Sequence, residues 1–106
     1  MNNRMRNKQE KKKRQAVNEI FDLALQVNGL TDRRQKVTGN LPTVFVWFAG
    51  HVSKLNVQVY VNGWERNVGP QKEFTIHTDS FKLYKELAEC KNFLIWLCDE
   101  VKNKDA

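Results

Sequence analysis

A short segment near the middle of the chain, TVFVWFA at 43–49, carries apolar side chains on both of its faces. Successive side chains of a β-strand point to opposite faces, so a strand with one buried face alternates apolar and polar residues. Two apolar sets alternate along this segment instead: Val44, Val46 and Phe48 on one face, and Phe45 and Trp47 on the other. The pattern predicts a strand whose second apolar face needs a covering partner.

A second strand is predicted at Lys54–Val61, which follows the first across a four-residue loop. If that loop closes without a bulge, opposed residues have numbers that sum to 103. One face of the hairpin then pairs apolar residues only, which makes it the predicted core face: Phe48 with Leu55, Val46 with Val57, and Val44 with Val59. The opposite face mixes aromatic and amide side chains and is the predicted partner interface: Phe45, Trp47, Asn56, Gln58 and Tyr60.

Apolar residues recur at helical spacing in two further segments, Lys8–Asn28 and Phe81–Val101. Gly29 follows the first of these and suits the left-handed position that ends a helix. The second contains FLIWLC at 93–98, which is apolar nearly all round. Such a stretch is predicted to be buried between the first helix and the sheet, or else to contribute to a subunit contact.

The remaining signals complete an α+β fold. Asn62 and Gly63 predict a turn, and Glu73–His77 predicts a further strand. Whether Trp64–Val68 forms one more short strand is left open by the pattern. The predicted order is α-β-β-β-α: an antiparallel meander of three strands, or four with Trp64–Val68, with two helices packed on one face. Two helices cover one face of such a sheet and leave the other face open.

Charge is distributed very unevenly along the 106 residues, which are predicted to form one domain. Residues 15–106 hold equal numbers of acidic and basic groups, so the net charge of +6 lies entirely in residues 1–14. We therefore expect a basic N-terminal arm at 1–14 and a single α+β domain at 15–106. Cations near the positive end of a helix dipole are unfavourable, so residues 1–10 are expected to fray without a bound anion.

The basic arm is the first candidate functional surface. Clustered cations release counterions from phosphate and attract nucleic acid without regard to sequence. The connection at 30–41 adds three more basic residues. The predicted nucleic-acid-binding residues are Arg4, Arg6, Lys8, Lys11, Lys12, Lys13, Arg14, Arg33, Arg34 and Lys36. The alternative is that the arm is only a solvated, solubilising tail.

The aromatic sheet face is the second candidate surface. Exposed aromatic residues on an antiparallel sheet can stack the bases of single-stranded nucleic acid. No lysine or arginine stands among the five predicted interface residues to hold a phosphate. Aromatic and amide groups with few charges are more typical of the centre of a protein interface. We therefore expect self-association or a protein partner here, with cover by residues 30–41 as the purely structural alternative.

Catalytic and metal chemistry find little support in the sequence. His51 and His77 lack a neighbouring nucleophile or ligands at metal-binding spacing, and there is no glycine-rich phosphate loop. Cys90 and Cys98 are eight residues apart on one predicted helix, too far for a disulfide, so reduced, packed thiols are expected. We expect no enzyme activity, catalytic residue, cofactor or metal. With neither a signal segment nor a membrane-length apolar run visible, a cytoplasmic protein without membrane contact is expected.

Two resemblances bear on function. The α-β-β-β-α order resembles the double-stranded-RNA-binding domain, but the Gly-Pro-x-His loop and lysine-rich helix start of that family are not matched, so only the topology is analogous. The run FAGHVSKLNVQVYVNGW at 48–64 resembles small uncharacterised phage and prophage proteins of Gram-positive bacteria. This resemblance implies a small binding or regulatory protein of a phage or mobile element. The sequence alternative is a pure protein-interaction module, such as a host-factor binder or an assembly subunit.

Overall fold

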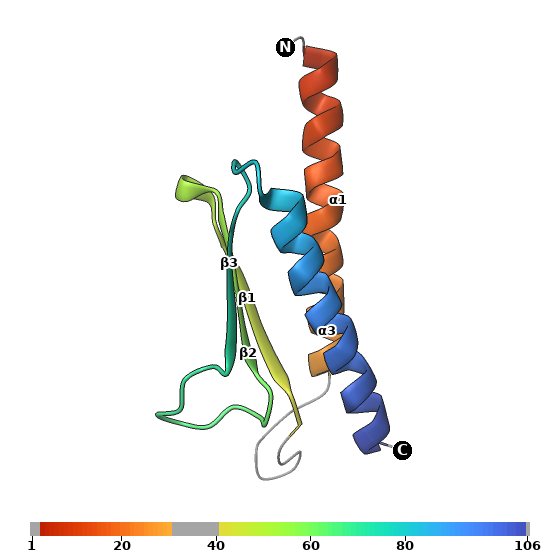
Figure 1. The fold of residues 1–106 in the computed structure, drawn as a ribbon, viewed down its shortest axis with the longest axis vertical. Coiled ribbons are helices and arrows are strands. Elements are labelled where there is room, and N and C mark those ends of the chain that lie inside the picture. The colour runs from red at the N-terminus through yellow and green to blue at the C-terminus, as the bar shows by residue number, and fades with distance from the viewer. Residues whose placement is uncertain (1–2, 31–40, 106) are drawn as a thin grey trace.

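Two helices pack side by side on one face of a three-stranded antiparallel sheet, which confirms the predicted α-β-β-β-α order (Figure 1). The computed structural model describes residues 3–30 and 41–105. The elements are α1 (Asn3–Asn28), β1 (Thr43–Ala49), the short 3-10 helix η1 (Gly50–Val52), β2 (Lys54–Tyr60), β3 (Lys72–His77) and α3 (Leu83–Asp105). The strand order is β1-β2-β3, so β2 is central.

The β1–β2 hairpin has the register that the apolar pattern predicts. Val44 pairs with Val59, Val46 with Val57, and Phe48 with Leu55. Ser53 closes the connecting turn in the left-handed conformation, with φ of 50°. Strand β3 then pairs antiparallel with the other edge of β2, from Lys54 opposite His77 to Val59 opposite Lys72.

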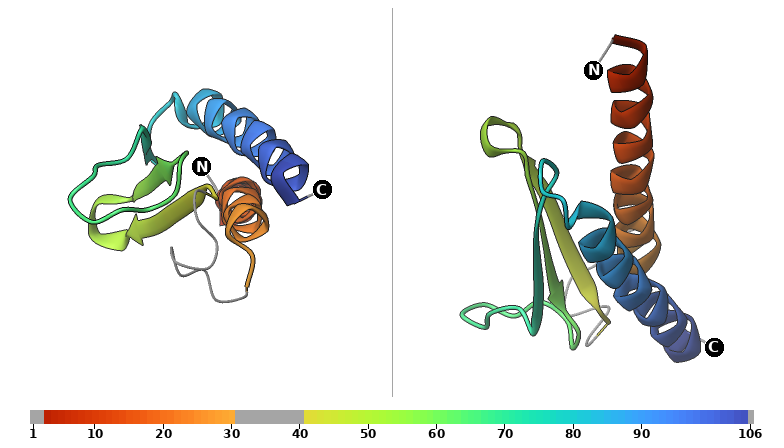
Figure 2. Two further views of the ribbon diagram at one scale, coloured as in Figure 1. Left: turned by 90° about the horizontal axis from the view of Figure 1, so that it is seen from below. Right: turned by 45° about the horizontal axis from the view of Figure 1, so that its top comes forward.

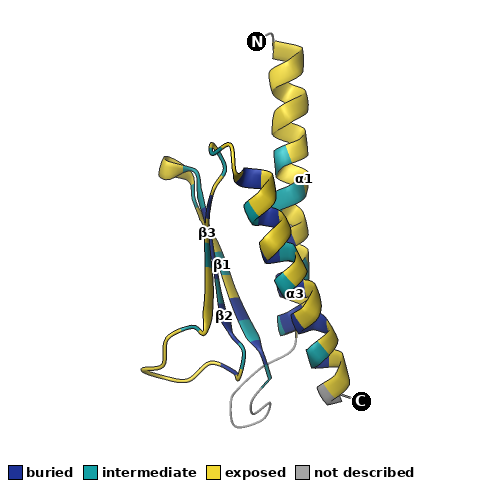
Figure 3. Cartoon of the chain, viewed as in Figure 1, coloured by how far each residue is buried: buried dark blue, intermediate teal, exposed yellow. Residues whose placement is uncertain are grey.

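The hydrophobic core lies between the sheet and both helices. The core-facing residues of β2 are fully buried, and they meet apolar residues of α1, β3 and α3. The most deeply buried members are Ile20, Val27, Leu55, Val57, Val59, Ile76, Leu83, Cys90, Leu94 and Leu97. Burial is concentrated where the helices flank the sheet, whereas the N-terminal turns of α1 and the hairpin end are exposed (Figure 3). Removal of this apolar surface from water stabilises the fold.

The segment Trp64–Val68 does not form a strand. Gly63 and Asn67 both have positive φ, 88° and 68°, which bends the chain away from extended geometry. The chain re-enters the sheet at Gln71, whose backbone N–H donates to the Val59 carbonyl at 3.0 Å. The Gln71 side chain also accepts a hydrogen bond from the Val61 N–H at 2.8 Å. The described part of the chain therefore has a three-stranded sheet, and the four-stranded alternative is wrong there.

Both helices differ from their predicted bounds at the N-terminal end. Helix α1 begins at Asn3 rather than Lys8, so the basic residues continue the helix; their expected fraying stays a prediction. Its predicted stop is confirmed, since Gly29 has φ of 71° and donates its N–H to the Leu25 carbonyl at 2.7 Å. Helix α3 begins at Leu83, after Ser80 Oγ accepts the Lys82 N–H at 3.1 Å, and Phe81 is left almost fully exposed.

The predictions for Phe48 and Tyr60 need correction. Phe48 lies on the core-facing side of β1, but 49% of it is exposed because α1 and the hairpin end diverge there. Tyr60 lies on the opposite face as predicted, yet it is only 7% exposed and packs edge-on against Phe45, with ring centroids 5.5 Å apart. Periodicity assigned each residue to its face but did not indicate how much of that face is covered.

The apolar stretch at 93–98 is less buried than the sequence suggests. Leu94, Leu97 and Cys98 are buried in the core, whereas Ile95 and Trp96 are 41% and 48% exposed. Phe93 bridges the two environments, because its ring lies 5.8 Å from that of Phe74 on β3 and 5.5 Å from that of Trp96. The expectation of burial on most sides is therefore wrong, and the subunit contact stays a prediction.

Asn28 joins the end of α1 to the edge of the sheet. Its Nδ2 donates to the Val44 carbonyl and its Oδ1 accepts the Val44 N–H, both at 2.8 Å. This amide therefore pairs with β1 as a neighbouring strand would, and it satisfies two backbone groups of a residue that is 4% exposed. The same residue thus helps to end the helix and blocks part of a free sheet edge.

We expect Asn28→Ala to lower the free energy of unfolding by about 1–3 kcal/mol, because it leaves the N–H and C=O of Val44 without their partners. Urea denaturation followed by circular dichroism measures the change. Gln26→Ala is the matched control, since that exposed amide bonds only to Asp22 among the described side chains, and a change within about 0.5 kcal/mol is expected. Equal effects of the two substitutions would contradict the proposed role of Asn28.

Candidate functional site

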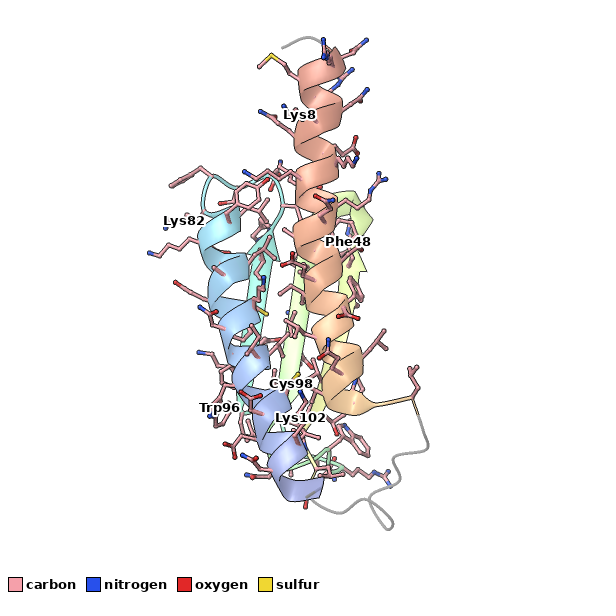
Figure 4. The ribbon with its side chains drawn as sticks, turned by 90° about the vertical axis from the view of Figure 1, so that its right-hand side faces the viewer. Lys8, Phe48, Lys82, Trp96, Cys98 and Lys102 are labelled. Atoms are coloured by element: carbon pink, nitrogen blue, oxygen red, sulfur yellow. The ribbon has the colours of Figure 1, made fainter. Side chains whose placement is uncertain are left out.

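The basic arm forms the N-terminal turns of α1, which project past the sheet and past the start of α3 (Figure 1). A helix of this length extends about 39 Å, whereas the seven-residue strand β1 extends about 23 Å. Figure 4 shows Lys8 on the projecting part, at the end of the molecule opposite Lys102. Six of the seven arm cations are exposed and Lys13 is half-buried.

Helical geometry divides the arm cations into separate stripes. Arg4, Lys8 and Lys11 follow the i, i+4, i+7 spacing that places side chains on one face of a helix. Lys12 is turned toward the second helix, where its Nζ lies 4.7 Å from the ring centroid of Tyr84 on α3. Arg6 and Lys13, seven residues apart, share a third stripe. The predicted contacts Arg33, Arg34 and Lys36 lie outside the described residues.

A groove of about 610 Å³ lies between α1, the end of the β1–β2 hairpin and the start of the β3–α3 connection. Arg6, Lys13 and Arg14 line it on the helix side, together with Val17 and Phe21. The opposite wall includes the exposed ring of Phe48, which Figure 4 shows beside α1. The structure therefore brings arm cations together with an aromatic residue that the sequence assigned to the core.

The open face of the sheet carries the five residues of the predicted partner interface. Phe45 and Trp47 are 41% and 45% exposed, while Gln58 is half-buried. Asn56 and Tyr60 are buried, at 6% and 7% exposure. Phe45 and Trp47 are thus the members of this set that are most available to a partner.

Glu73 belongs to this open face, although the sequence did not single it out. Its Oε2 accepts hydrogen bonds from Gln58 Nε2 at 2.7 Å and from Asn56 Nδ2 at 3.2 Å. Asn56 Nδ2 also lies 3.1 Å from Thr75 Oγ1, whereas Asn56 Oδ1 has no hydrogen-bond partner within the described part of the chain. The β2–β3 register could have identified Glu73 as part of this face, because it places Glu73 opposite Gln58. That register depends on the length of the turn at 61–71.

The hydrogen bonds from Gln58 and Asn56 lower the pKa of the Glu73 carboxyl below its usual value of 4.5, with a smaller contribution from the nearby Lys54 ammonium. The carboxylate is therefore ionised at neutral pH and places a negative charge on the open face, on the far side of β2 from Phe45 and Trp47. A phosphate backbone is repelled by such a charge. This observation disfavours nucleic acid on the open sheet face and is consistent with a protein partner.

The two candidate surfaces lie on different sides of the molecule. The helices cover one face of the sheet and the opposite face points away from them, as the two views of Figure 2 show. The arm belongs to the helix layer, whereas Phe45 and Trp47 belong to the far face. A single ligand in contact with both surfaces would have to pass around the sheet. The arm and the open face are therefore separate candidate sites.

Reactive groups in the described residues offer little chemistry. Cys90 and Cys98 are free and buried, and desolvation raises the pKa of both thiols, that of Cys90 to about 12. A thiol that is protonated at neutral pH is a poor nucleophile. Within residues 3–30 and 41–105 there is no group of three or more His, Cys, Asp or Glu side chains arranged to bind a metal ion. No helix in these residues has the length and apolar character needed to cross a bilayer.

No protein-family model matches the chain, and no curated protein or solved structure is significantly similar to it. The resemblances to phage proteins and to the double-stranded-RNA-binding domain therefore stay predictions.

The pKa of Glu73 offers a direct test of the open-face network. We expect Gln58→Ala to raise this pKa toward the usual glutamate value, because it removes the shorter of the two side-chain hydrogen bonds to the carboxylate. A folded pKa below the unfolded value stabilises the protein above the unfolded pKa. That contribution is lost as pH falls through the folded pKa. Carbon-detected NMR titration measures the shift, and Gln26→Ala should leave it unchanged.

Proposed function

We propose that this chain is a small non-enzymatic binding protein that contacts nucleic acid through the basic turns of α1. The observation that supports the proposal best is that the whole excess of positive charge lies on a helix that projects past the sheet. Phosphates spaced along a nucleic acid match a row of exposed cations better than a single small anion does. The open sheet face would serve self-association or binding to a protein partner.

The electrostatics of α1 support a role beyond solubility. The first turn of α1 contains no acidic residue, so its cations lie near the positive end of the helix dipole, which is unfavourable. No described carboxylate forms a salt bridge with the arm; the salt bridge in the described residues joins Lys91 to Glu19 at 2.8 Å. Bound phosphates would neutralise these charges and stabilise the same turns. Binding and helix order would therefore be coupled.

The alternative is a protein-interaction module in which the arm is only solvated. Phe45 and Trp47 favour this reading, because two large exposed aromatic rings beside the Glu73 network resemble the centre of a protein interface. The two functions are compatible, since their surfaces lie on different sides of the sheet. They are also separable by experiments that change one surface at a time.

Lys8→Gln/Lys11→Gln tests the nucleic-acid function of the arm. Glutamine keeps helix propensity close to that of lysine, so charge is the main change. If both lysines contact phosphates, the plot of log affinity against log salt loses about 1.4–1.8 of its slope. Fluorescence anisotropy with labelled DNA and RNA over a salt series measures this slope.

Lys102→Gln/Lys104→Gln is the matched control, because it removes the same charge near the opposite end of the molecule, in the last turns of α3. Its salt slope should equal that of the parent. If the unaltered chain binds neither DNA nor RNA at low salt, the arm function is wrong. If both double variants lose equal slope, Lys8 and Lys11 make no specific phosphate contact, and any contact lies on the Arg6 and Lys13 side of the helix.

Trp47→Ala tests the open face as an interface. We expect this substitution to weaken self-association or partner binding, because it removes an exposed aromatic ring from that face. Trp64→Ala is a close control, since Trp64 in the turn at 61–71 is 47% exposed against 45% for Trp47. Sedimentation velocity over a concentration series measures the association state. A parent that remains monomeric throughout would rule out self-association there, and equal effects of both substitutions would argue against a specific role for Trp47.

A further inference from the structure

We propose that the groove between α1 and the hairpin end binds a single strand of nucleic acid, with an unpaired base against Phe48 and phosphates on Arg6 and Lys13. This inference rests on the proposed function and names the substrate class. Arg6, Lys13 and Phe48 belong to one groove although they come from distant parts of the chain. Its volume of about 610 Å³ lies within the ordinary range of ligand sites, roughly 300–1,000 Å³.

Phe48 provides the aromatic wall. Its side chain lies on the helix-facing side of the sheet, yet 49% of it remains exposed because α1 and the hairpin diverge there. Phe21 and Val17 extend the apolar surface on the α1 side of the groove. An aromatic ring exposed in a groove can stack the face of any base, which gives affinity without sequence preference.

The cations of the groove are placed to hold a backbone. Arg6 and Lys13 share one stripe of α1, about 10 Å apart along the helix axis, so they reach separate phosphates. Arg14 adds a third cation at the same groove. Arg4, Lys8 and Lys11 lie on the opposite side of α1, because a rotation of about 100° per residue places the two stripes about half a turn apart. The three separated cations of the groove favour a ligand with repeated negative charge over a compact acidic one.

Polar groups complete the lining and favour a base over a simple apolar ligand. Asn18, Ser53 and Thr78 can exchange hydrogen bonds with base edges. The carboxylates of Glu10 and Asp79 also line the groove, where they can accept hydrogen bonds from amino groups of bases. Arg6, Lys13 and Arg14 outnumber them and leave the groove net positive.

A single strand fits these features better than a duplex does. In a duplex the bases are stacked on one another and paired, so Phe48 would gain nothing from a base unless that base were unstacked. A single strand offers free base faces and phosphates together. The open sheet face, where the sequence first suggested base stacking, combines its aromatic residues with the Glu73 carboxylate, which accepts hydrogen bonds from Asn56 and Gln58. The groove instead combines Phe48 with Arg6, Lys13 and Arg14.

Phe48→Ala tests the inference on the full-length chain. Fluorescence anisotropy is measured with labelled single-stranded DNA and RNA of about 12 nucleotides, and with a duplex of the same length. The loss of one stacked base should weaken single-strand binding by about 5- to 150-fold. Duplex affinity should change less than about two-fold, because phosphate contacts on α1 are retained.

Two control variants separate stacking from general damage. Phe48→Tyr keeps an aromatic face and should retain single-strand affinity. Trp64→Ala removes an aromatic ring of similar exposure, 47%, from the turn at 61–71, which belongs to neither candidate surface, and should leave the affinity unchanged. Circular dichroism and urea denaturation verify that each variant folds. If Phe48→Ala does not fold, Phe48→Leu replaces it, because leucine fills the site without an aromatic face.

The outcomes distinguish this inference from the proposed function. If the parent chain binds both single strands and duplex in a salt-dependent way, and Phe48→Ala leaves both affinities unchanged or weakens them equally, the groove assignment is overturned. The basic arm would remain a nucleic-acid contact. If a polyglutamate peptide binds as tightly as the single strands and its binding depends on Phe48, the ligand of the groove is an acidic protein segment and not a nucleic acid. No binding to any nucleic acid at low salt would overturn both proposals.

Discussion

The burial of the central strand β2 against both helices is the constraint on which the rest of the structure depends. Leu55, Val57 and Val59 are fully buried on one face of this strand, between β1 and β3. Both helices lie on this side of the sheet, where their apolar residues pack against these three and remove them from water. The opposite face is left open as a direct consequence, and its aromatic residues remain available for contacts.

The difference in length between α1 and the sheet exposes the basic arm, the other candidate surface. A helix of 26 residues extends well past a seven-residue strand, so its N-terminal turns have no sheet to pack against. Charged residues are favoured there, because those turns meet solvent. Where the helix and the hairpin diverge, Phe48 loses the cover that its position in the strand would otherwise provide. The groove is therefore a by-product of packing a long helix on a short sheet.

Charge separates the two surfaces as clearly as geometry does. The arm is strongly positive, whereas the open face holds Glu73 in a network with two amide side chains. The arm therefore carries a concentrated positive charge, whereas on the open face the Glu73 carboxylate lies near the Lys54 ammonium. Under the proposed function, nucleic acid and a protein partner would occupy opposite sides of the sheet.

Features that depend on local pattern could be predicted from the order of residues. Alternation along 43–49 and the short loop that follows it specified the hairpin register, and Gly29 marked the end of α1, because both depend on residues close together in the chain. The location of the net charge was equally evident. These features were enough to predict the α-β-β-β-α order and both candidate surfaces.

Which of these residues are covered depends on how the helices pack on the sheet, and the local pattern did not predict it. Phe48 and Tyr60 were assigned to the correct faces, but their exposures, 49% and 7%, depend on where the helix diverges and where the Phe45 ring lies. Glu73 joined the open face through a register that the turn at 61–71 sets. The alternation along a strand specifies the face to which each side chain points. The elements that cover that face are distant in sequence. For that reason the groove at Phe48 could be recognised only in the folded chain.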